Sequence, residues 1–274
     1  MPSASPNCST SSANSPLRPS PGRMMRQHRG MPILERSSRE AYPLWLRSAQ
    51  SAGAFLLLDK PRGWTSFEAV AFVRRQLRRR AGHAGTLDPL ATGLLIVGIG
   101  TATKLLTDFQ QLPKTYVTTL KLGAITETDD AEAPEQVLCP EVRVTEQELQ
   151  QVLERFRGEI SQTPPRYAAV KYRGKRLYEL ARAGVQFQPL PRRVTIFELE
   201  LQGMELPYVQ LRIVCSAGTY VRAIARDIGT ALGCGAYVVE LRRSAIGEYR
   251  VEEALTPEEF TQCTASYAPL HPVG

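Results

Sequence analysis

The sequence predicts an α+β fold with a mixed, largely antiparallel central sheet. Segments whose apolar residues predict strands are interspersed with segments of helical periodicity along most of the 274 residues. Most connections between them are too short for repeated βαβ crossovers, which favours a mixed or antiparallel sheet. The chain is long enough to bury a large core, as one large domain or two small ones.

The first predicted elements are two strands separated by a helix. Ala54–Leu58 and Leu94–Val97 are short apolar runs, which predict buried strands. Thr65 and Glu68 have capping-box spacing, and apolar residues follow them at helical spacing. We expect this helix to carry the arginine cluster between Arg74 and Arg80.

The second half of the chain is predicted to continue this mixture. Residues 127–135 are acidic and turn-rich, which predicts a loop. Thr145 and Glu148 form a second capping box, and Gly158 is the expected stop of that helix. Another helix is expected to open after Gly218 and Thr219. The predicted strands are Lys114–Leu122, Ala236–Leu241 and a hairpin of Arg192–Leu201 with Tyr208–Cys215 that turns at Gly203.

Residues 1–50 differ from the rest. They are rich in Ser, Pro and Arg, contain no acid before Glu35 and show no hydrophobic periodicity, so we expect order to begin at Ala54. Three interpretations stay open for this extension. It is a disordered tail, an Arg- and Ser-rich transit peptide, or the result of a start placed before Met24, Met25 or Met31.

The charge balance favours a polyanionic partner. The net charge is +7, and basic residues cluster instead of mixing with acids. Solvated surfaces usually mix both signs, so we interpret the clusters as nucleic-acid contacts. They are Arg74, Arg75, Arg78, Arg79 and Arg80; Lys171, Arg173, Lys175 and Arg176; and the pairs Arg192–Arg193 and Arg242–Arg243.

Metal, disulfide and membrane roles have little support. The five cysteines are scattered without a CxxC pair, and the chain has only three histidines. No run approaches the ~20 apolar residues of a transmembrane helix. We therefore expect no metal site and a reducing compartment. We expect this compartment to be the bacterial cytoplasm, or a plastid or other organelle if the extension is a transit peptide.

A glycine-rich run at residues 82–93 (GHAGTLDPLATG) is the most distinctive segment. Its glycines permit positive φ or close approach of another chain, and Pro89 makes Asp88 extended. The run thus predicts an ordered loop that presents the Asp88 carboxylate. The local alternative is a helix-entry turn with Asp88 as a cap.

The same run resembles the catalytic motif of the TruB family of tRNA pseudouridine synthases, Gly-His-x-Gly-x-Leu-Asp-Pro-x-Ala-x-Gly. Residues 114–117 (KTYV) resemble a Lys-x-Tyr motif of that family, and residues 218–222 (GTYVR) resemble its Gly-Thr-Tyr-x-Arg motif. A further match is residues 59–66 (DKPRGWTS). The resemblance extends from about residue 54 to residue 259.

The resemblance implies three catalytic residues. Asp88 matches the nucleophile, Arg222 matches the cation that pairs with it, and Tyr116 matches the ring that stacks on the target base and assists proton removal. Arginine suits the pairing because it stays charged when buried and can contact a carboxylate bidentately. Taken locally, Arg222 would be an exposed helix residue pairing with Asp227, and Tyr116 a half-buried strand residue.

The resemblance also implies binding residues. Tyr220 and Leu241 match positions that line the uridine pocket, although core packing explains each equally well locally. His83 matches a residue that occupies the region vacated by the flipped-out nucleotide. Lys60 matches a residue beside the active site, which we interpret as structural or as a phosphate contact.

The implied protein is a tRNA pseudouridine synthase with the fold of that enzyme class. It would isomerise a flipped-out uridine of the T loop, without cofactor or metal, as a monomer bound to the T arm. Residues 145–185 resemble the insertion that grips this arm. We expect an extension over 1–50, a catalytic domain over 51–260 and a tail over 261–274, without the PUA-type domain of many relatives.

Two other function classes remain for comparison. A non-catalytic RNA-binding protein would have no need for Asp88, Tyr116 and Arg222 together. A glycosidase-like hydrolase would need a second carboxylate beside Asp88.

Overall fold

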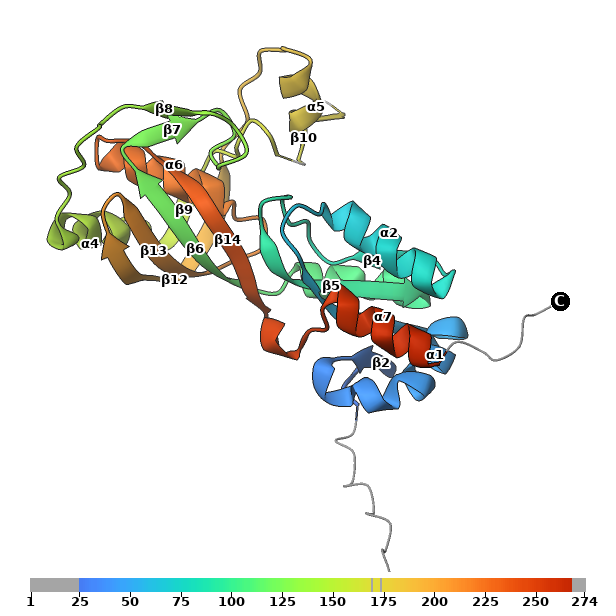
Figure 1. Cartoon of the computed structure of the whole chain (residues 1–274). Helices are drawn as coiled ribbons and strands as arrows, with labels where there is room; N and C mark the ends of the chain where they lie inside the picture. Colours follow the sequence, from blue (N-terminus) through green and yellow to red (C-terminus); the bar gives the residue numbers. More distant parts are fainter. Residues whose placement is uncertain (1–24, 169, 173, 268–274) are drawn as a thin grey trace, which may run out of the picture.

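A mixed sheet of eleven strands runs through the whole molecule (Figure 1). The computed structural model describes residues 25–267 except 169 and 173. Two neighbouring pairs, β2–β3 and β5–β14, are parallel, and the other pairs are antiparallel. The predicted α+β class with a mixed, largely antiparallel sheet is therefore confirmed. The strand order is β1-β2-β3-β5-β14-β6-β13-β12-β9, with β4 paired to β5 and β15 paired to β14.

The first half of the sheet is covered on both faces. Leu56 and Leu58 of β3 pack with the helices α1, α2 and α7, whereas Phe55 and Leu57 pack on the opposite face with α3. Because both faces are buried, these strands are continuous apolar runs. The elements are β1 (Gln27–His28), β2 (Met31–Leu34), β3 (Gly53–Lys60), β4 (Ala81–His83), β5 (Thr92–Gly100), α1 (Tyr42–Gln50), α2 (Ser66–Leu77), α3 (Leu106–Gln110) and α7 (Pro257–Ser266).

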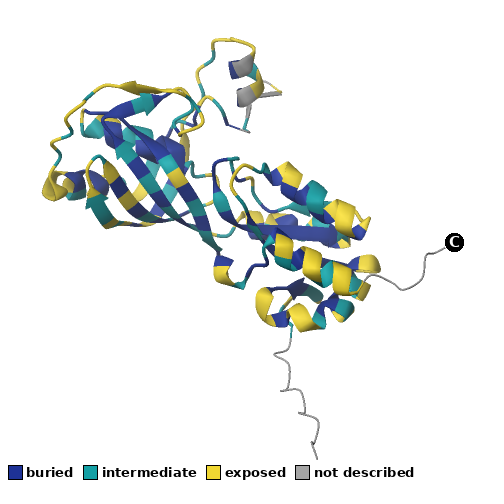
Figure 2. Ribbon diagram, in the orientation of Figure 1, coloured by how far each residue is buried: buried dark blue, intermediate teal, exposed yellow. Residues whose placement is uncertain are grey.

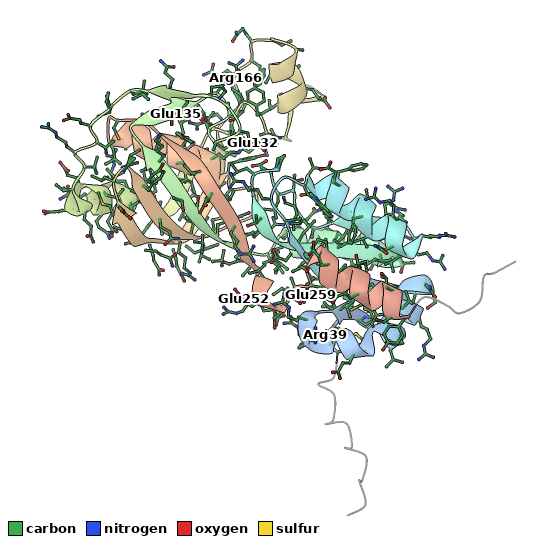
Figure 3. The ribbon with its side chains drawn as sticks, in the orientation of Figure 1. Arg39, Glu132, Glu135, Arg166, Glu252 and Glu259 are labelled. Carbon is green, nitrogen blue, oxygen red and sulfur yellow. The ribbon has the colours of Figure 1, made fainter. Side chains whose placement is uncertain are left out.

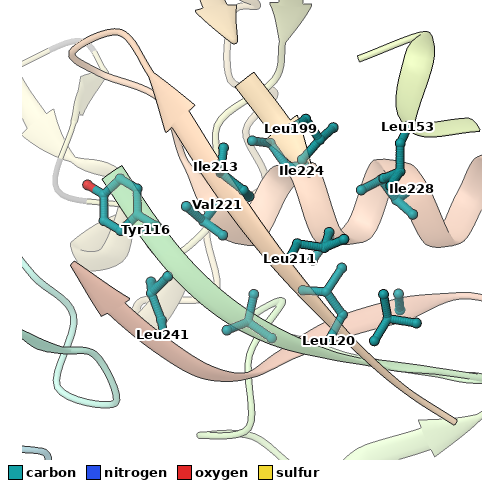
Figure 4. Packing of buried hydrophobic residues seen from close by; sticks show 14 of the residues in the cluster. Tyr116, Leu120, Leu153, Leu199, Leu211, Ile213, Val221, Ile224, Ile228 and Leu241 are labelled. Atoms are coloured by element: carbon teal, nitrogen blue, oxygen red, sulfur yellow. The ribbon is translucent and has the colours of Figure 1, made fainter. Parts of the chain in front are cut away.

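The second half of the sheet is covered mainly on one face. Every second residue of β6 is buried, and the helices α4 and α6 pack on that face (Figure 4). Figure 2 shows the other side of these strands as partly exposed. The elements are β6 (Lys114–Leu122), β9 (Gly158–Gln162), β12 (Arg192–Glu205), β13 (Tyr208–Cys215), β14 (Ala236–Ile246), β15 (Tyr249–Arg250), α4 (Glu146–Glu154) and α6 (Val221–Ala231).

Smaller elements lie outside this framework. A projection carries the short helix α5 and is seen at the top of Figure 1. The 3-10 turns η1, η2 and η3 connect the larger elements. The remaining bounds are β7 (Ala124–Thr126), β8 (Glu135–Val137), β10 (Lys171–Tyr172), β11 (Lys175–Arg176), α5 (Leu177–Arg182), η1 (Arg36–Ala41), η2 (Thr101–Leu105) and η3 (Val251–Glu253).

The prediction that order begins at Ala54 is wrong. Residues 25–50 form β1, β2, η1 and α1, while residues 1–24 lie outside the described part of the chain. Tyr42, Trp45 and Ala49 are buried, and the rings of Tyr42 and Trp45 contact Phe260 of α7. The Trp45 indole donates to the carbonyl of Phe55 at 2.7 Å. Figure 3 shows Arg39, Glu252 and Glu259 gathered where this layer meets the C-terminal segment.

Several predicted boundaries also shift. Helix α2 ends at Leu77, and Arg78 takes a left-handed C-cap conformation, so only part of the arginine cluster is helical. The β12–β13 hairpin turns at Leu206 and Pro207 instead of Gly203. Helix α7 continues to Ser266, beyond the predicted domain end at residue 260. Both predicted capping boxes are present, as is the expected helix after Gly218 and Thr219.

The two halves of the sheet meet through a very short parallel contact. Only Thr92 and Gly93 of β5 pair with Arg242 and Arg243 of β14. Gly93 has φ +107, and a Cβ there would lie 2.3 Å from the Arg243 carbonyl oxygen. This close approach requires glycine and places the loop before β5 against the second half.

We expect Gly93→Ala to lower the free energy of unfolding by at least about 2 kcal/mol, because backbone strain and a clash with Arg243 add together. Gly158→Ala is the matched control, since Gly158 has φ +83 but nothing within 4 Å of the added Cβ. Urea unfolding of both variants measures the difference. Equal losses would show that the close approach at Gly93 is unimportant.

Candidate active site

A cavity of about 350 Å³ opens where the two halves of the sheet meet. It brings together five of the seven residues expected to form the site. The lining residues are Gly85, Thr86, Leu87, Asp88, Gln110, Lys114, Tyr116, Val170, Ser216, Gly218, Thr219, Tyr220, Val221, Arg222, Leu241 and Arg243.

The loop that carries Asp88 is fixed through its backbone. The Ser66 hydroxyl lies 2.7 Å from the amide N of Leu87, from which it accepts, and 3.1 Å from the Leu87 carbonyl oxygen. The amide of Gly63 donates to the carbonyl of Pro89 at 2.8 Å. The Asp88 side chain remains 33% exposed, so its carboxylate is held in place yet accessible from the cavity.

Arg222 lies at the start of α6 and is 4% exposed. Its Nε is 2.9 Å from Oδ2 of Asp88, an ion pair in which the N–H is not aligned for a hydrogen bond. The terminal nitrogens donate instead to the carbonyls of Thr128 and Tyr167, at 2.8 and 3.1 Å. The expected pair is therefore present, but its expected bidentate geometry is wrong, and Arg222 is not the exposed partner of Asp227.

A second carboxylate, Asp130, was missed from the sequence. It is 1% exposed and its Oδ2 lies 3.4 Å from Nη1 of Arg222. Its other oxygen accepts from the Thr128 hydroxyl at 2.6 Å and from the amide of Glu132 at 3.0 Å. The acidic loop thus holds Arg222 from outside the cavity, since none of its residues is among the described lining residues. The acidic run at residues 127–135, in a chain of positive net charge, was the sequence feature that could have indicated this contact.

Tyr116 and Leu241 form the apolar side of the cavity. Both are buried at one edge of the cluster of the second half, and the Tyr116 hydroxyl points away from the aliphatic side chains (Figure 4). Burial raises the pKa of Tyr116, while the charge of Arg243 opposes this rise.

Tyr220 is positioned by a buried amide. The Gln162 side chain accepts from the Tyr220 amide at 2.8 Å and donates to the Tyr220 carbonyl at 3.1 Å. This pair of bonds fixes the backbone just before α6 and the direction in which Tyr220 enters the cavity. Gln162 is a positioning residue that no motif indicated.

Two further cations, Arg243 and Lys114, line the cavity. Arg243 is 1% exposed and donates to the carbonyls of Leu94 and Gly85, at 2.8 and 3.2 Å. Lys114 donates to the carbonyls of Phe109, Gln110 and Leu112. Burial and the charge of Arg243 lower the pKa of Lys114 to about 8.

Lys60 and His83 do not line the cavity. Lys60 is fully buried, and its ammonium donates to the carbonyls of Pro61 and Trp64 at 2.9 and 2.6 Å. Its role as a substrate phosphate contact is therefore wrong, and the structural interpretation fits. His83 lies half-buried in β4, where burial and the charge of Arg243 lower its pKa.

The predicted basic clusters differ in their surroundings. Arg243 is buried, and Arg242 holds both oxygens of Asp59, so neither is a free phosphate contact as predicted. Arg193 pairs with Glu159. The prediction for the cluster at residues 171–176 concerns side chains outside the described part of the chain, which leaves out Arg173 and the side chains of Lys171, Lys175 and Arg176.

The cavity can hold a planar ring between Tyr116, Leu241 and Tyr220, with a carboxylate and a guanidinium beside it. Asp88 is the only carboxylate among the described lining residues, which disfavours a two-carboxylate hydrolase. Within the described residues, no cluster of three His, Cys, Asp or Glu side chains could hold a metal ion. None of the described helices is long and apolar enough to span a bilayer.

Two family models match the chain. Residues 74–221 match the TruB family pseudouridylate synthase N-terminal domain, and residues 222–269 match the tRNA pseudouridylate synthase B C-terminal domain. A curated relative from Parabacteroides distasonis, named tRNA pseudouridine synthase B, is 46% identical over 76% of this chain and 92% of its own. Another of that name, from Azoarcus sp. strain BH72, is 50% identical over 77% of this chain and 70% of its own.

Solved structures share the fold. A Cbf5-Nop10-Gar1 complex contains a chain that is 30% identical, with a TM-score of 0.59 over 85% of this chain. A chain of an archaeal box H/ACA sRNP Nop10-Cbf5 complex is 29% identical, with a TM-score of 0.56 over 74% of this chain. The present chain spans 51–59% of the length of those two chains.

We expect Arg222→Met to lower the free energy of unfolding by about 3 kcal/mol, because Asp130 stays buried without its cation. Adding Asp130→Asn should recover part of this loss, which a double-mutant cycle in urea measures. Arg226→Met is the control, since Arg226 lies one turn later on α6 and pairs with the less buried Asp129 and Asp227. Additive losses would contradict the pairing.

The stability contributed by Lys114 should depend on pH. Its folded-state pKa of about 8 lies below its ordinary value of 10.5, so the unfolded chain binds more protons between these pH values. The stability of the wild type should therefore rise, relative to Lys114→Met, as the pH increases from 7 to 9.5. Urea unfolding at both pH values measures this, and a pH-independent difference would refute the lowered pKa.

Proposed function

Because the chain belongs to the TruB family of pseudouridylate synthases, we propose that it isomerises uridine to pseudouridine in the T loop of tRNA. The curated relatives carry the name of a tRNA-modifying enzyme, and the matched segments include every residue of the cavity. We place the activity in the bacterial cytoplasm, where such relatives would meet tRNA.

The observation that carries the proposal is the grouping of Asp88, Arg222 and Tyr116 around one cavity. The three residues come from a loop, a helix and a strand that are far apart in the sequence. A protein that only binds RNA does not need an arginine and a tyrosine placed beside a partly exposed aspartate. We therefore favour the enzyme over the RNA-binding alternative.

Asp88 is proposed as the group that reacts. Isomerisation breaks the bond between ribose C1′ and N1 of the base and forms a bond from C1′ to C5. The carboxylate can add to C1′, add to C6 of the ring, or take a proton from C2′. Each route uses the Asp88 carboxylate, whose Oδ2 lies 2.9 Å from Nε of Arg222.

Tyr116 is proposed to hold the base and to accept the C5 proton. The target ring would stack on Tyr116 and meet Leu241 and Tyr220, which keeps the detached base in the cavity while it rotates. Accepting this proton requires Tyr116 as the phenolate, so its own hydroxyl proton must first leave to solvent. Burial raises the pKa of Tyr116 and opposes that loss, whereas the charge of the neighbouring Arg243 lowers the pKa and would stabilise the phenolate.

The uridine must leave its stack to enter this cavity. Enzymes that act on a base extrude it from the nucleic acid. His83 is proposed to occupy the vacated region, since it lies five residues before Asp88 on the same ordered segment. Residues 145–185 are proposed to hold the T arm, and Figure 3 shows Arg166 beside the projection that carries α5.

We expect Asp88→Asn to abolish pseudouridine formation in unmodified tRNA, because an amide is not a nucleophile of comparable strength. The Kd for tRNA should stay within about tenfold, ~1.4 kcal/mol, since phosphate contacts dominate RNA affinity. Asp227→Asn is the matched control on α6, outside the cavity. Product formation by Asp88→Asn at the wild-type rate would exclude Asp88 as nucleophile.

A further inference from the structure

The outer face of α2 carries an exposed strip that the proposed chemistry does not use. Phe67, Ala71, Arg74, Arg75 and Arg78 follow one another at intervals of three, four or one residue, so they share one side of the helix and its cap. We call these residues the α2 strip. Phe67 is 69% exposed, and the three arginines are exposed as well.

Among the described residues, the arginines at the C-terminal end of the strip have no neighbouring carboxylates. Together with Arg79 and Arg80, its arginines surround a hollow of about 780 Å³. Among the described residues, no carboxylate lies within 4 Å of any of these five guanidinium groups, whereas the exposed Arg143 and Arg193 are each paired with a glutamate. A helix C-terminus favours one or two cations, but five without counter-charge exceed what the helix dipole accounts for.

The strip begins beside the candidate active site. Ser66, the neighbour of Phe67, holds the backbone of Leu87 next to Asp88. From Phe67 the strip extends about 17 Å to Arg78, at 1.5 Å per residue. An RNA whose nucleotide enters the cavity would therefore have its adjoining backbone within reach of this helix (Figure 1).

We propose that the α2 strip is a second RNA-binding surface, in which the arginines bind backbone phosphates and Phe67 stacks on a base next to the flipped uridine. The inference rests on the proposed action on tRNA. Guanidinium groups contact phosphate oxygens bidentately, and exposed aromatic rings stack on unpaired bases. Phe67 lies at the end of the strip near the cavity, where an unpaired base would stack on it. The arginines lie farther from the cavity, where the RNA strand would join a duplex and present its phosphates.

The charge contribution is tested with Arg74→Gln/Arg75→Gln. We expect tRNA affinity to fall at least fivefold near physiological salt and the salt dependence of log K to become shallower by about 1.5, since two phosphate contacts are lost. The matched control is Arg36→Gln/Arg39→Gln, which removes the same charge from exposed residues of η1, outside both the α2 strip and residues 145–185. The control should change affinity less than twofold.

The stacking contribution is tested with Phe67→Ala. We expect weaker tRNA binding with an unchanged salt dependence, and recovery in Phe67→Trp, because a ring contributes no charge. Leu44→Ala is the control, since Leu44 is similarly exposed on α1. The rate at saturating tRNA should stay near that of the wild type in every strip variant, because none of these residues lines the cavity.

The outcomes separate the two proposals. A wild-type protein that makes no pseudouridine in tRNA refutes the proposed function, whatever the strip does. An active wild type whose strip variants bind tRNA like their controls refutes the RNA-binding strip alone. Binding of an acidic protein at the strip, with tRNA affinity unaffected, would likewise overturn it.

Discussion

The buried guanidinium of Arg222 is the interaction on which the site depends. It lies between Asp88 of the loop before β5 and Asp130 of the acidic loop, and it also donates to the carbonyls of Thr128 and Tyr167. A buried cation is tolerated only when such partners neutralise and hydrogen-bond it. One side chain thereby links the Asp88 carboxylate, the acidic loop and the segment that leads into the projection.

The sheet explains why these groups can meet. Asp88 belongs to the half that is buried on both faces, whereas Tyr116, Leu241 and Arg222 belong to the half covered by α4 and α6. The halves touch through two residues of β5 and two of β14, where Gly93 allows close contact. Arg243 then crosses this junction and binds the carbonyls of Leu94 and Gly85, so the same strand pair positions the loop.

Local signals in the sequence predicted much of the fold and part of the site. Capping boxes and period-two alternation depend on neighbouring residues, so α2, α4 and β6 were predictable. The layer formed by residues 25–50 was missed because its average composition hid the helical spacing of Tyr42, Trp45 and Ala49. The burial of α1 depends on α7, more than 200 residues later, which no local pattern reveals.

In the site, too, local motifs were predictable, whereas contacts between distant segments were not. Motifs identified Asp88, Tyr116 and Arg222, but the Asp130 contact depends on a loop folding back onto α6. Charge alone suggested that Arg242 and Arg243 bind RNA, whereas the partly exposed Arg242 is paired with Asp59 and Arg243 is buried. Burial of Lys60 beneath the loop is likewise a tertiary property that its motif does not contain.

Nucleotide-resolution mapping of pseudouridine in an unmodified tRNA transcript, incubated with the purified wild-type protein, tests the central claim most directly. The cavity has one carboxylate among its described lining residues, and the proposed function predicts conversion of a single uridine in the T loop. Conversion of a uridine elsewhere with the T loop intact, or a transcript left unchanged, would contradict it.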